Sequence, residues 1–127
     1  MPKYQVIVPS NISPYPEKFE VSAAAILSEH FKCDVEFIRR SNIRTADVII
    51  GNVIWEIKSP TGSGKRNIQH QFYRALKQSQ NIVIDARRSK LHITKIIREL
   101  QRQYLMTKNI KRLLLITKTG KVIDFAK

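Results

Sequence analysis

Two acids and a lysine near residue 50 have the types and spacing suited to metal and phosphate chemistry. Asp47 and Glu56 lie on either side of a Gly51-Asn52 dipeptide, and Lys58 follows Glu56 by two positions. Magnesium is usually held by one or two carboxylates together with water. A lysine beside such an ion is placed so that its ammonium group can contact a phosphate or a water molecule. These three residues are therefore the candidate catalytic set.

A β-hairpin is predicted to bring the three side chains together. Both runs flanking Gly51-Asn52 are rich in β-branched residues, and this dipeptide is a two-residue turn signal. The resulting register places Asp47 opposite Glu56, and strand alternation places Lys58 on the same face as Glu56. Opposed carboxylates repel and destabilise a sheet. A divalent cation, Mg²⁺ or Mn²⁺, would offset that cost.

The other face of the same hairpin is wholly apolar, which supports this register. It is predicted to belong to the core and comprises Val48, Ile50, Val53, Trp55 and Ile57. The acidic face is then expected at a cleft or in solvent. A simpler interpretation stays open, in which the two acids are solvent-exposed surface residues without a function and the lysine neutralises one of them.

Composition points to a polyanionic partner. The chain of 127 residues has 23 Lys and Arg against 10 Asp and Glu, a net charge of +13. Nucleic acid is the first expectation, and an acidic membrane or an acidic protein such as an inhibitor is the second. Cys33 is the only cysteine, so no intrachain disulfide is possible. With no signal peptide pattern or membrane-spanning run, we expect the chain to act in a reducing cytoplasm, native or reached by delivery.

Apolar strands alternate with amphipathic helices along the chain, which predicts one α/β domain over residues 1–127. The central mixed β-sheet should be flanked by helices. Besides the hairpin, strands are expected at residues 4–8, 34–38, 82–84, 113–117 and 122–125. Helices are expected at about residues 17–31, 66–79 and 92–106.

The segment Asp47…Glu56-Ile57-Lys58 resembles the D-x(n)-E-x-K signature of PD-(D/E)xK nucleases. The order helix, hairpin, helix, strand is also similar to the core of that superfamily. The resemblance implies that the acids bind a divalent metal and that the lysine activates water or stabilises the transition state. It also implies a further acid from the preceding helix, for which Glu20 is the first candidate and Glu17 the second. A solvated acid at a helix start is an equal alternative for Glu20.

A more specific resemblance covers roughly residues 20–125. The run Glu56-Ile-Lys-Ser-Pro-Thr-Gly62, Gln71, residues 81–85 and Arg87-Arg88-Ser89 are similar to the C-terminal tRNase domain of CdiA contact-dependent growth inhibition toxins. The resemblance implies a metal-dependent RNase that cuts tRNA and is neutralised by a cognate immunity protein. It implies catalytic roles for Asp47, Glu56 and Lys58, and it implies that Asn67 and Gln71 position phosphate or water.

Several basic or amide side chains are candidate contacts to the nucleic-acid backbone. The glycine-rich segment 59–66 precedes a predicted helix, where free backbone N–H groups bind anions. It is not an ATP-binding loop, because Arg66 stands where the metal-binding hydroxyl is required. The alternatives are that segment 59–66 is a plain flexible turn and that the basic residues are solvated loop charges. The candidates are Lys65, Arg66, Asn67, Arg74, Arg87 and Arg88.

Two other functions stay open from the sequence. One is a DNA endonuclease of the same fold, since the fold does not fix the sugar. The other is a non-catalytic basic module that binds nucleic acid or a protein. The three histidines, His30, His70 and His92, are not predicted to converge, so a metal-free acid–base pair is not expected.

Overall fold

The computed structural model describes residues 3–38, 48–64 and 66–126. Within them the chain is α/β, and its strands hydrogen-bond in sequence order as a mixed seven-stranded sheet. This confirms the predicted fold class. Contacts gather into two compact units, Met1–Trp55 and Glu56–Lys127, which are described in turn; a single domain over residues 1–127 stays a prediction. No helix in the described part of the chain is long and apolar enough to cross a membrane.

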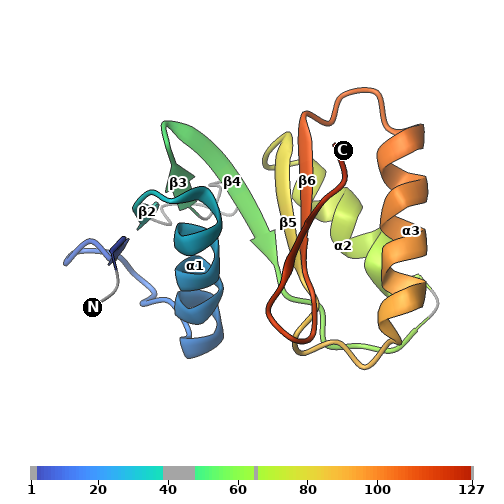
Figure 1. Ribbon diagram of the computed structural model, residues 1–127, viewed down its shortest axis with the longest axis horizontal. Coiled ribbons are helices and arrows are strands. Elements are labelled where there is room, and N and C mark those ends of the chain that lie inside the picture. The colour runs from blue at the N-terminus through green and yellow to red at the C-terminus, as the bar shows by residue number, and fades with distance from the viewer. Residues whose placement is uncertain (1–2, 39–47, 65, 127) are drawn as a thin grey trace. The chain divides into compact units, whose positions relative to one another are not determined.

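The first unit packs helix α1 (Lys18–Phe31) on short strands (Figure 1). Strand β1 (Val6–Ile7) runs parallel to β2 (Val35–Phe37), and β2 runs antiparallel to β3 (Val48–Ile50). The helix buries a narrow stripe of small and aliphatic side chains, Ala23, Ala24 and Leu27. It ends where Lys32 adopts a left-handed conformation with φ of 55°.

The hairpin between β3 and β4 (Val53–Lys58) has the predicted turn and register. Gly51 and Asn52 both have positive φ, 54° and 67°, as a two-residue hairpin turn with matching strand twist requires. Val48 pairs with Trp55, and Ile50 pairs with Val53. The pairing confirms the register over the described residues of both strands.

One hairpin residue departs from the predicted core. Val48, Ile50, Trp55 and Ile57 are buried, but Val53 is 39% exposed. Val53 directly follows the turn, so alternation puts it on the core face while the end of the hairpin leaves it uncovered. Its assignment to the core was therefore wrong.

The second unit is a mainly parallel sheet with helices on one face. The later half of β4 pairs in parallel with β5 (Asn81–Asp85), and β5 pairs in parallel with β6 (Arg112–Ile116). Strand β7 (Val122–Asp124) returns antiparallel to β6. Helices α2 (Asn67–Leu76) and α3 (Ile93–Met106) cover the same face of β5 and β6 (Figure 1). The core between these layers comprises Ile68, Phe72, Ala75, Ile82, Ile84, Ala86, Ile96, Leu100, Leu113 and Leu115.

The two helices of this unit differ by a few residues from the predicted helices, and for α3 a capping contact explains the difference. Helix α2 ends at Leu76, three residues before the predicted end. Helix α3 begins one residue later than predicted, because His92 serves as its N-cap. The Nδ1 atom of His92 accepts a hydrogen bond of 3.2 Å from the backbone N–H of Thr94. That contact gives His92 a structural role.

A branched side chain at position 51 should destabilise the protein. We expect Gly51→Val to lower the free energy of unfolding by about 1–2 kcal/mol, because a left-handed conformation brings Cβ against the following carbonyl. Space is not the limit, since an added Cβ would lie 3.9 Å from Cys33 Sγ. Gly51→Asn is the matched control, because asparagine tolerates positive φ. Thermal and urea unfolding measure both variants, and equal stability of Gly51→Val and Gly51→Asn would contradict the turn geometry.

Candidate active site

Glu56 and Lys58 lie on the face of β4 that looks toward the helices of the second unit. In the parallel pairing with β5, Glu56 is opposite Ile82 and Lys58 is opposite Ile84. Paired residues of neighbouring strands point to the same side of a sheet, and both isoleucines belong to the core beneath α2 and α3. Strand alternation therefore places this acid and this lysine side by side on the helix-covered face.

The acid and the lysine form an ion pair. Glu56 is only 2% exposed, and its Oε2 atom lies 3.1 Å from Nζ of Lys58. The sequence predicted an acidic face at a cleft or in solvent, and Glu56 is in fact buried. Burial of an isolated carboxylate is costly, so a nearby cation is required. In this structure the ammonium group of Lys58, itself about one-fifth exposed, supplies that charge.

The donor set is compatible with a hard divalent cation. Among the described residues, no three His, Cys, Asp or Glu side chains form a cluster that could hold a metal. Magnesium does not need such a cage, since one or two carboxylates and several waters suffice. Glu56 provides one carboxylate of this kind, and its ion pair with Lys58 shows that the carboxylate accommodates a neighbouring positive charge.

For the two other predicted acidic ligands, Asp47 and Glu20, the described residues show no contact that places them beside Glu56. Asp47 lies outside the described residues, so its predicted place opposite Glu56 stays a prediction. Glu20 lies in the first turn of α1, where its Oε1 atom accepts a hydrogen bond of 2.8 Å from the backbone N–H of Glu17. This is one half of a capping box, a structural use of the Glu20 carboxylate. Its predicted role as a metal ligand stays untested.

Helix α2 carries the predicted phosphate-positioning amides on its first two turns. Asn67 and Gln71 are half-buried and are separated by one helical turn. Asn67 packs closely against the loop after β4, since a Cβ at Gly62 would lie 3.0 Å from Asn67 Nδ2. Glycine at position 62 thus leaves room for the amide. Arg74, one turn beyond Gln71, is exposed.

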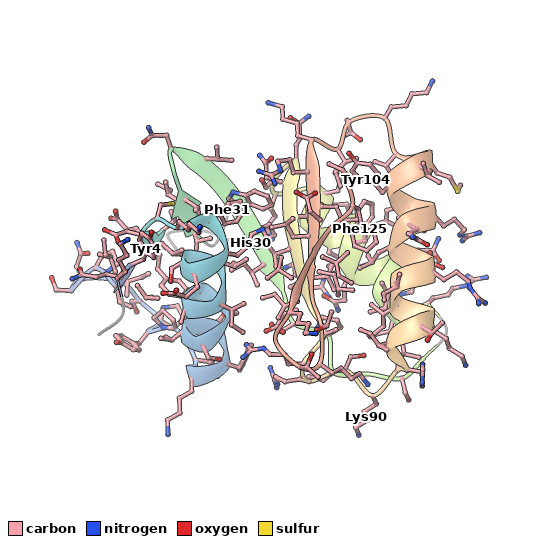
Figure 2. The ribbon with its side chains drawn as sticks, viewed as in Figure 1. Tyr4, His30, Phe31, Lys90, Tyr104 and Phe125 are labelled. Carbon is pink, nitrogen blue, oxygen red and sulfur yellow. The ribbon has the colours of Figure 1, made fainter. Side chains whose placement is uncertain are left out.

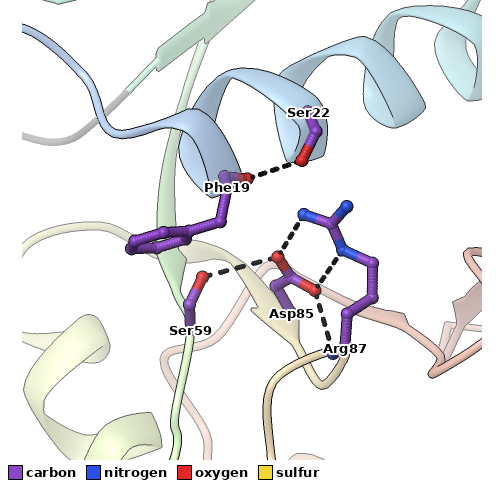
Figure 3. Close-up of polar contacts among 5 residues, drawn as sticks. All are labelled: Phe19, Ser22, Ser59, Asp85 and Arg87. Atoms are coloured by element: carbon purple, nitrogen blue, oxygen red, sulfur yellow. Dashed lines mark hydrogen bonds and ion pairs between the residues drawn. The ribbon is translucent and has the colours of Figure 1, made fainter.

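A second buried ion pair lies at the end of the neighbouring strand β5 (Figure 3). Asp85 is fully buried and accepts hydrogen bonds from the guanidinium of Arg87 at 2.9 and 2.8 Å, and from its backbone N–H at 3.1 Å. The hydroxyl of Ser59, the residue after Lys58, donates to the same carboxylate at 3.4 Å. This contact ties the end of β4 to the end of β5.

The sequence analysis assigned Arg87 to nucleic acid and gave Asp85 no role. The carboxylate of Asp85 raises the pKa of the Arg87 guanidinium, mainly through their hydrogen bonds, against the opposing effect of burial. A raised pKa keeps the Arg87 guanidinium charged throughout the neutral range. The sequence did hold one indication of this pair: Asp85 is the last residue of an apolar strand, and an arginine follows it by two positions.

The remaining basic candidates differ in accessibility. Arg66 and Arg88 are exposed, and Lys65 lies outside the described residues. A cavity of about 450 Å³ between α3 and β7 is lined by other side chains, including Tyr104 and Phe125 (Figure 2). None of its lining residues is a predicted site residue. The cavity therefore does not coincide with the candidate active site at Glu56 and Lys58.

Neutralising Asp85 should cost far more than neutralising a more exposed acid in a similar pair. We expect Asp85→Asn to lower the free energy of unfolding by about 3 kcal/mol, because it leaves the largely buried Arg87 charge without its counter-ion. Asp124→Asn is the control: Asp124 lies 2.7 Å from Arg112, but that arginine is 40% exposed. Its loss should cost about 0.2–1 kcal/mol. Urea unfolding compares them, and equal losses would refute the structural importance of the Asp85–Arg87 pair.

Comparison with known proteins places the chain in a family. A structural match with a TM-score of 0.66 and 19% sequence identity covers 95% of this chain and 97% of a chain from the "CdiA-CT/CdiI toxin and immunity complex from Burkholderia pseudomallei". At that identity the match shows a shared fold. No curated protein sequence matches. The family model for the contact-dependent growth inhibition CdiA C-terminal domain matches residues 44–122, more than half of the chain, so the chain belongs to this family.

Proposed function

We propose that this domain is a metal-dependent nuclease of the PD-(D/E)xK type and acts as a growth-inhibition toxin on RNA, with tRNA as the favoured substrate. The observation that carries the proposal is the buried Glu56 carboxylate, 3.1 Å from the ammonium of Lys58 at the carboxyl end of β4. Membership of the CdiA C-terminal family supports the toxin role. The net charge of +13 supports a polyanionic substrate.

The proposed chemistry assigns separate roles to the carboxylates and the lysine. Bound Mg²⁺ or Mn²⁺ would lower the pKa of a water molecule and polarise the phosphate. Glu56 would hold the cation, with Asp47 as the second carboxylate and Glu20 as a third candidate. Lys58 would exchange its contact with Glu56 for one with the attacked phosphate and steady its developing negative charge. From the adjoining helix, Gln71 would orient the scissile phosphate or the attacking water.

The toxin role implies a protein partner and a place of action. The structural relative is described as a toxin in complex with an immunity protein. We propose that a cognate immunity protein neutralises this domain too, and that its binding surface is acidic because it must match a domain of charge +13. The proposed site of action is the cytoplasm of a target bacterium, where tRNA is present.

The decisive test is incubation of the purified chain with total tRNA, ribosomal RNA and plasmid DNA, with Mg²⁺ or with EDTA. We expect cleavage of tRNA in Mg²⁺ and none in EDTA. Cleavage of the plasmid alone would favour a DNA endonuclease of the same fold. Salt-sensitive binding without cleavage of any substrate would favour a non-catalytic module and overturn the proposal.

Variants of the ion pair then test the assigned residues. We expect Glu56→Gln and Lys58→Ala each to lower the cleavage rate at least about 100-fold, the usual cost of removing one charge-stabilising group. Lys111→Ala is the control, since Lys111 is an exposed lysine before β6 and has no assigned role. Circular dichroism must show that each variant is folded. A folded Lys58→Ala variant with full activity would exclude the lysine from catalysis.

Metal binding can be measured without catalysis. We expect Mn²⁺ at 100 times its Kd to stabilise the wild-type chain by about 2.7 kcal/mol, as ligand linkage requires. Glu56→Gln and Asp47→Asn should reduce this gain because each removes a charged ligand. Glu36→Gln, an exposed strand glutamate, is the matched control and should keep it. If the Glu56→Gln variant keeps the full gain in thermal shift, the ion is bound elsewhere.

A further inference from the structure

One flank of helix α3 borders the cavity at the last strand of the second unit. Ile97, Gln101 and Leu105 recur at every fourth position, so their side chains lie along one line of the helix. Ile97 packs partly against the core, whereas Gln101 is exposed and Leu105 is 84% exposed. The line therefore leads from the core out to solvent, and all three side chains line the cavity.

Strand β7 supplies the opposite wall of the cavity. The backbone N–H of Phe125 donates to the carbonyl of Leu113 at 3.1 Å, so the pairing with β6 continues just past the end of β7. Ile123 and Phe125 are two positions apart, and alternation along the strand puts their side chains on one face. In the described part of the chain β7 is the last strand of the sheet. The cavity of about 450 Å³ thus lies beside an edge strand.

Two aromatic rings line this cavity, Tyr104 from α3 and Phe125 from the end of β7 (Figure 2). Both side chains are half-buried and pack against the core, which restricts their orientations. The ring contacts between aromatic side chains in the described part of the chain involve neither of them. A planar ligand in the cavity would therefore stack on rings that no other aromatic side chain of these residues covers.

The polar groups of the cavity suit a ligand with hydrogen-bonding edges. The exposed amide of Gln101 offers both donors and an acceptor. The one carboxylate in the lining, that of Asp124, accepts hydrogen bonds from the guanidinium of Arg112 at 2.7 Å and from the backbone N–H of Ala126 at 2.9 Å. The arginine compensates the charge of Asp124, so this carboxylate does not repel an anionic ligand as an isolated acid would.

The charge around the cavity favours an anionic ligand. The second unit has 17 Lys and Arg and four Asp and Glu. Two of its exposed bases are close to the cavity in sequence, since Arg98 follows Ile97 and Lys121 precedes Ile123 by two positions. A nucleotide has a planar base, polar base edges and a negative phosphate, and so it matches all three properties of the site. Single-stranded RNA is commonly recognised through unstacked bases that lie on aromatic rings and hydrogen-bond to side chains.

We propose that the cavity between α3 and β7 binds one unstacked nucleobase of the RNA substrate, on the rings of Tyr104 and Phe125 and with Gln101 at the base edge. The inference rests on the proposed nuclease function and deepens it by adding a base-recognition site. Strand β7 is three strands from β4, which corresponds to about 14 Å at the usual strand spacing. The base is therefore recognised away from Glu56 and Lys58, so the pocket contributes affinity and sequence preference rather than chemistry.

A fluorescent base and matched leucine variants test the stacking. The probe is a short uridine-rich RNA with one 2-aminopurine, whose fluorescence is quenched when this base stacks. Tyr104→Leu and Phe125→Leu keep apolar side chains but remove the rings, and Gln101→Ala removes the amide at an exposed position. Tyr15→Leu is the control, because Tyr15 is 69% exposed in the first unit and does not line the cavity. Binding is measured in EDTA, where metal-dependent cleavage does not occur, and circular dichroism checks that each variant is folded.

We expect Tyr104→Leu and Phe125→Leu each to weaken RNA binding at least about fivefold, since one base stacked on an aromatic ring contributes that much or more. Quenching of the 2-aminopurine should fall in both variants. The slope of log K against log salt should stay unchanged, because neither variant removes a phosphate contact. Gln101→Ala should weaken binding by about two- to tenfold, the usual contribution of one hydrogen bond. Tyr15→Leu should bind like the wild type.

Wild-type affinity and quenching in both leucine variants would overturn the proposal and favour an immunity protein as the occupant, because leucine keeps the apolar surface that such a partner needs. An equal loss in Tyr15→Leu would also overturn it. If a leucine variant misfolds, unchanged RNA affinity of Gln101→Ala overturns the proposal. The nuclease function is judged separately. A wild-type chain that quenches the probe but cuts no RNA would overturn only that function, and a chain that cuts tRNA while the pocket variants bind normally would overturn only the pocket.

Discussion

The alternation of side chains along β4 is the constraint on which the proposed site depends. In six residues this strand sends Trp55 and Ile57 into the apolar interior and Glu56 and Lys58 to the opposite face. Its first half is fixed by the hairpin with β3 and its second half by parallel pairing with β5. A slip of one residue would exchange the two faces, which would place two charges where Trp55 and Ile57 pack and would separate the Glu56–Lys58 pair from its present position. The energetic cost of that exchange fixes where the ion pair can lie.

The hairpin could be predicted from sequence because its determinants are local. The glycine and asparagine of the turn, together with β-branched flanks, fix the register whatever the rest of the chain does. The alternation of strands and helices likewise predicted the α/β class, since periodicity is a property of each segment. The exposure of Val53 could not be predicted in this way. It depends on what covers the end of the hairpin, which is a tertiary property.

The candidate site was predictable only in part, for a similar reason. The spacing of Glu56 and Lys58 predicted that they share a face, and the ion pair at 3.1 Å agrees. The burial of Glu56 and the Asp85–Arg87–Ser59 contacts depend on strands β4 and β5 lying side by side, although Ser59 and Asp85 are far apart in sequence. Arg87 illustrates the limit: sequence shows that a charge exists, but whether the protein itself uses that charge is decided by packing.

Strand β4 pairs with β3 in its first half and with β5 in its second half, and this limits how the hairpin can vary among related proteins. Because one strand is held by β3 over Val53–Trp55 and by β5 over Glu56–Lys58, no loop separates the two pairings. An inserted or deleted residue between them cannot be absorbed locally and would invert the orientation of every side chain on one side of it. Length changes within this strand should therefore occur in steps of two residues, and single-residue changes should be confined to the turn.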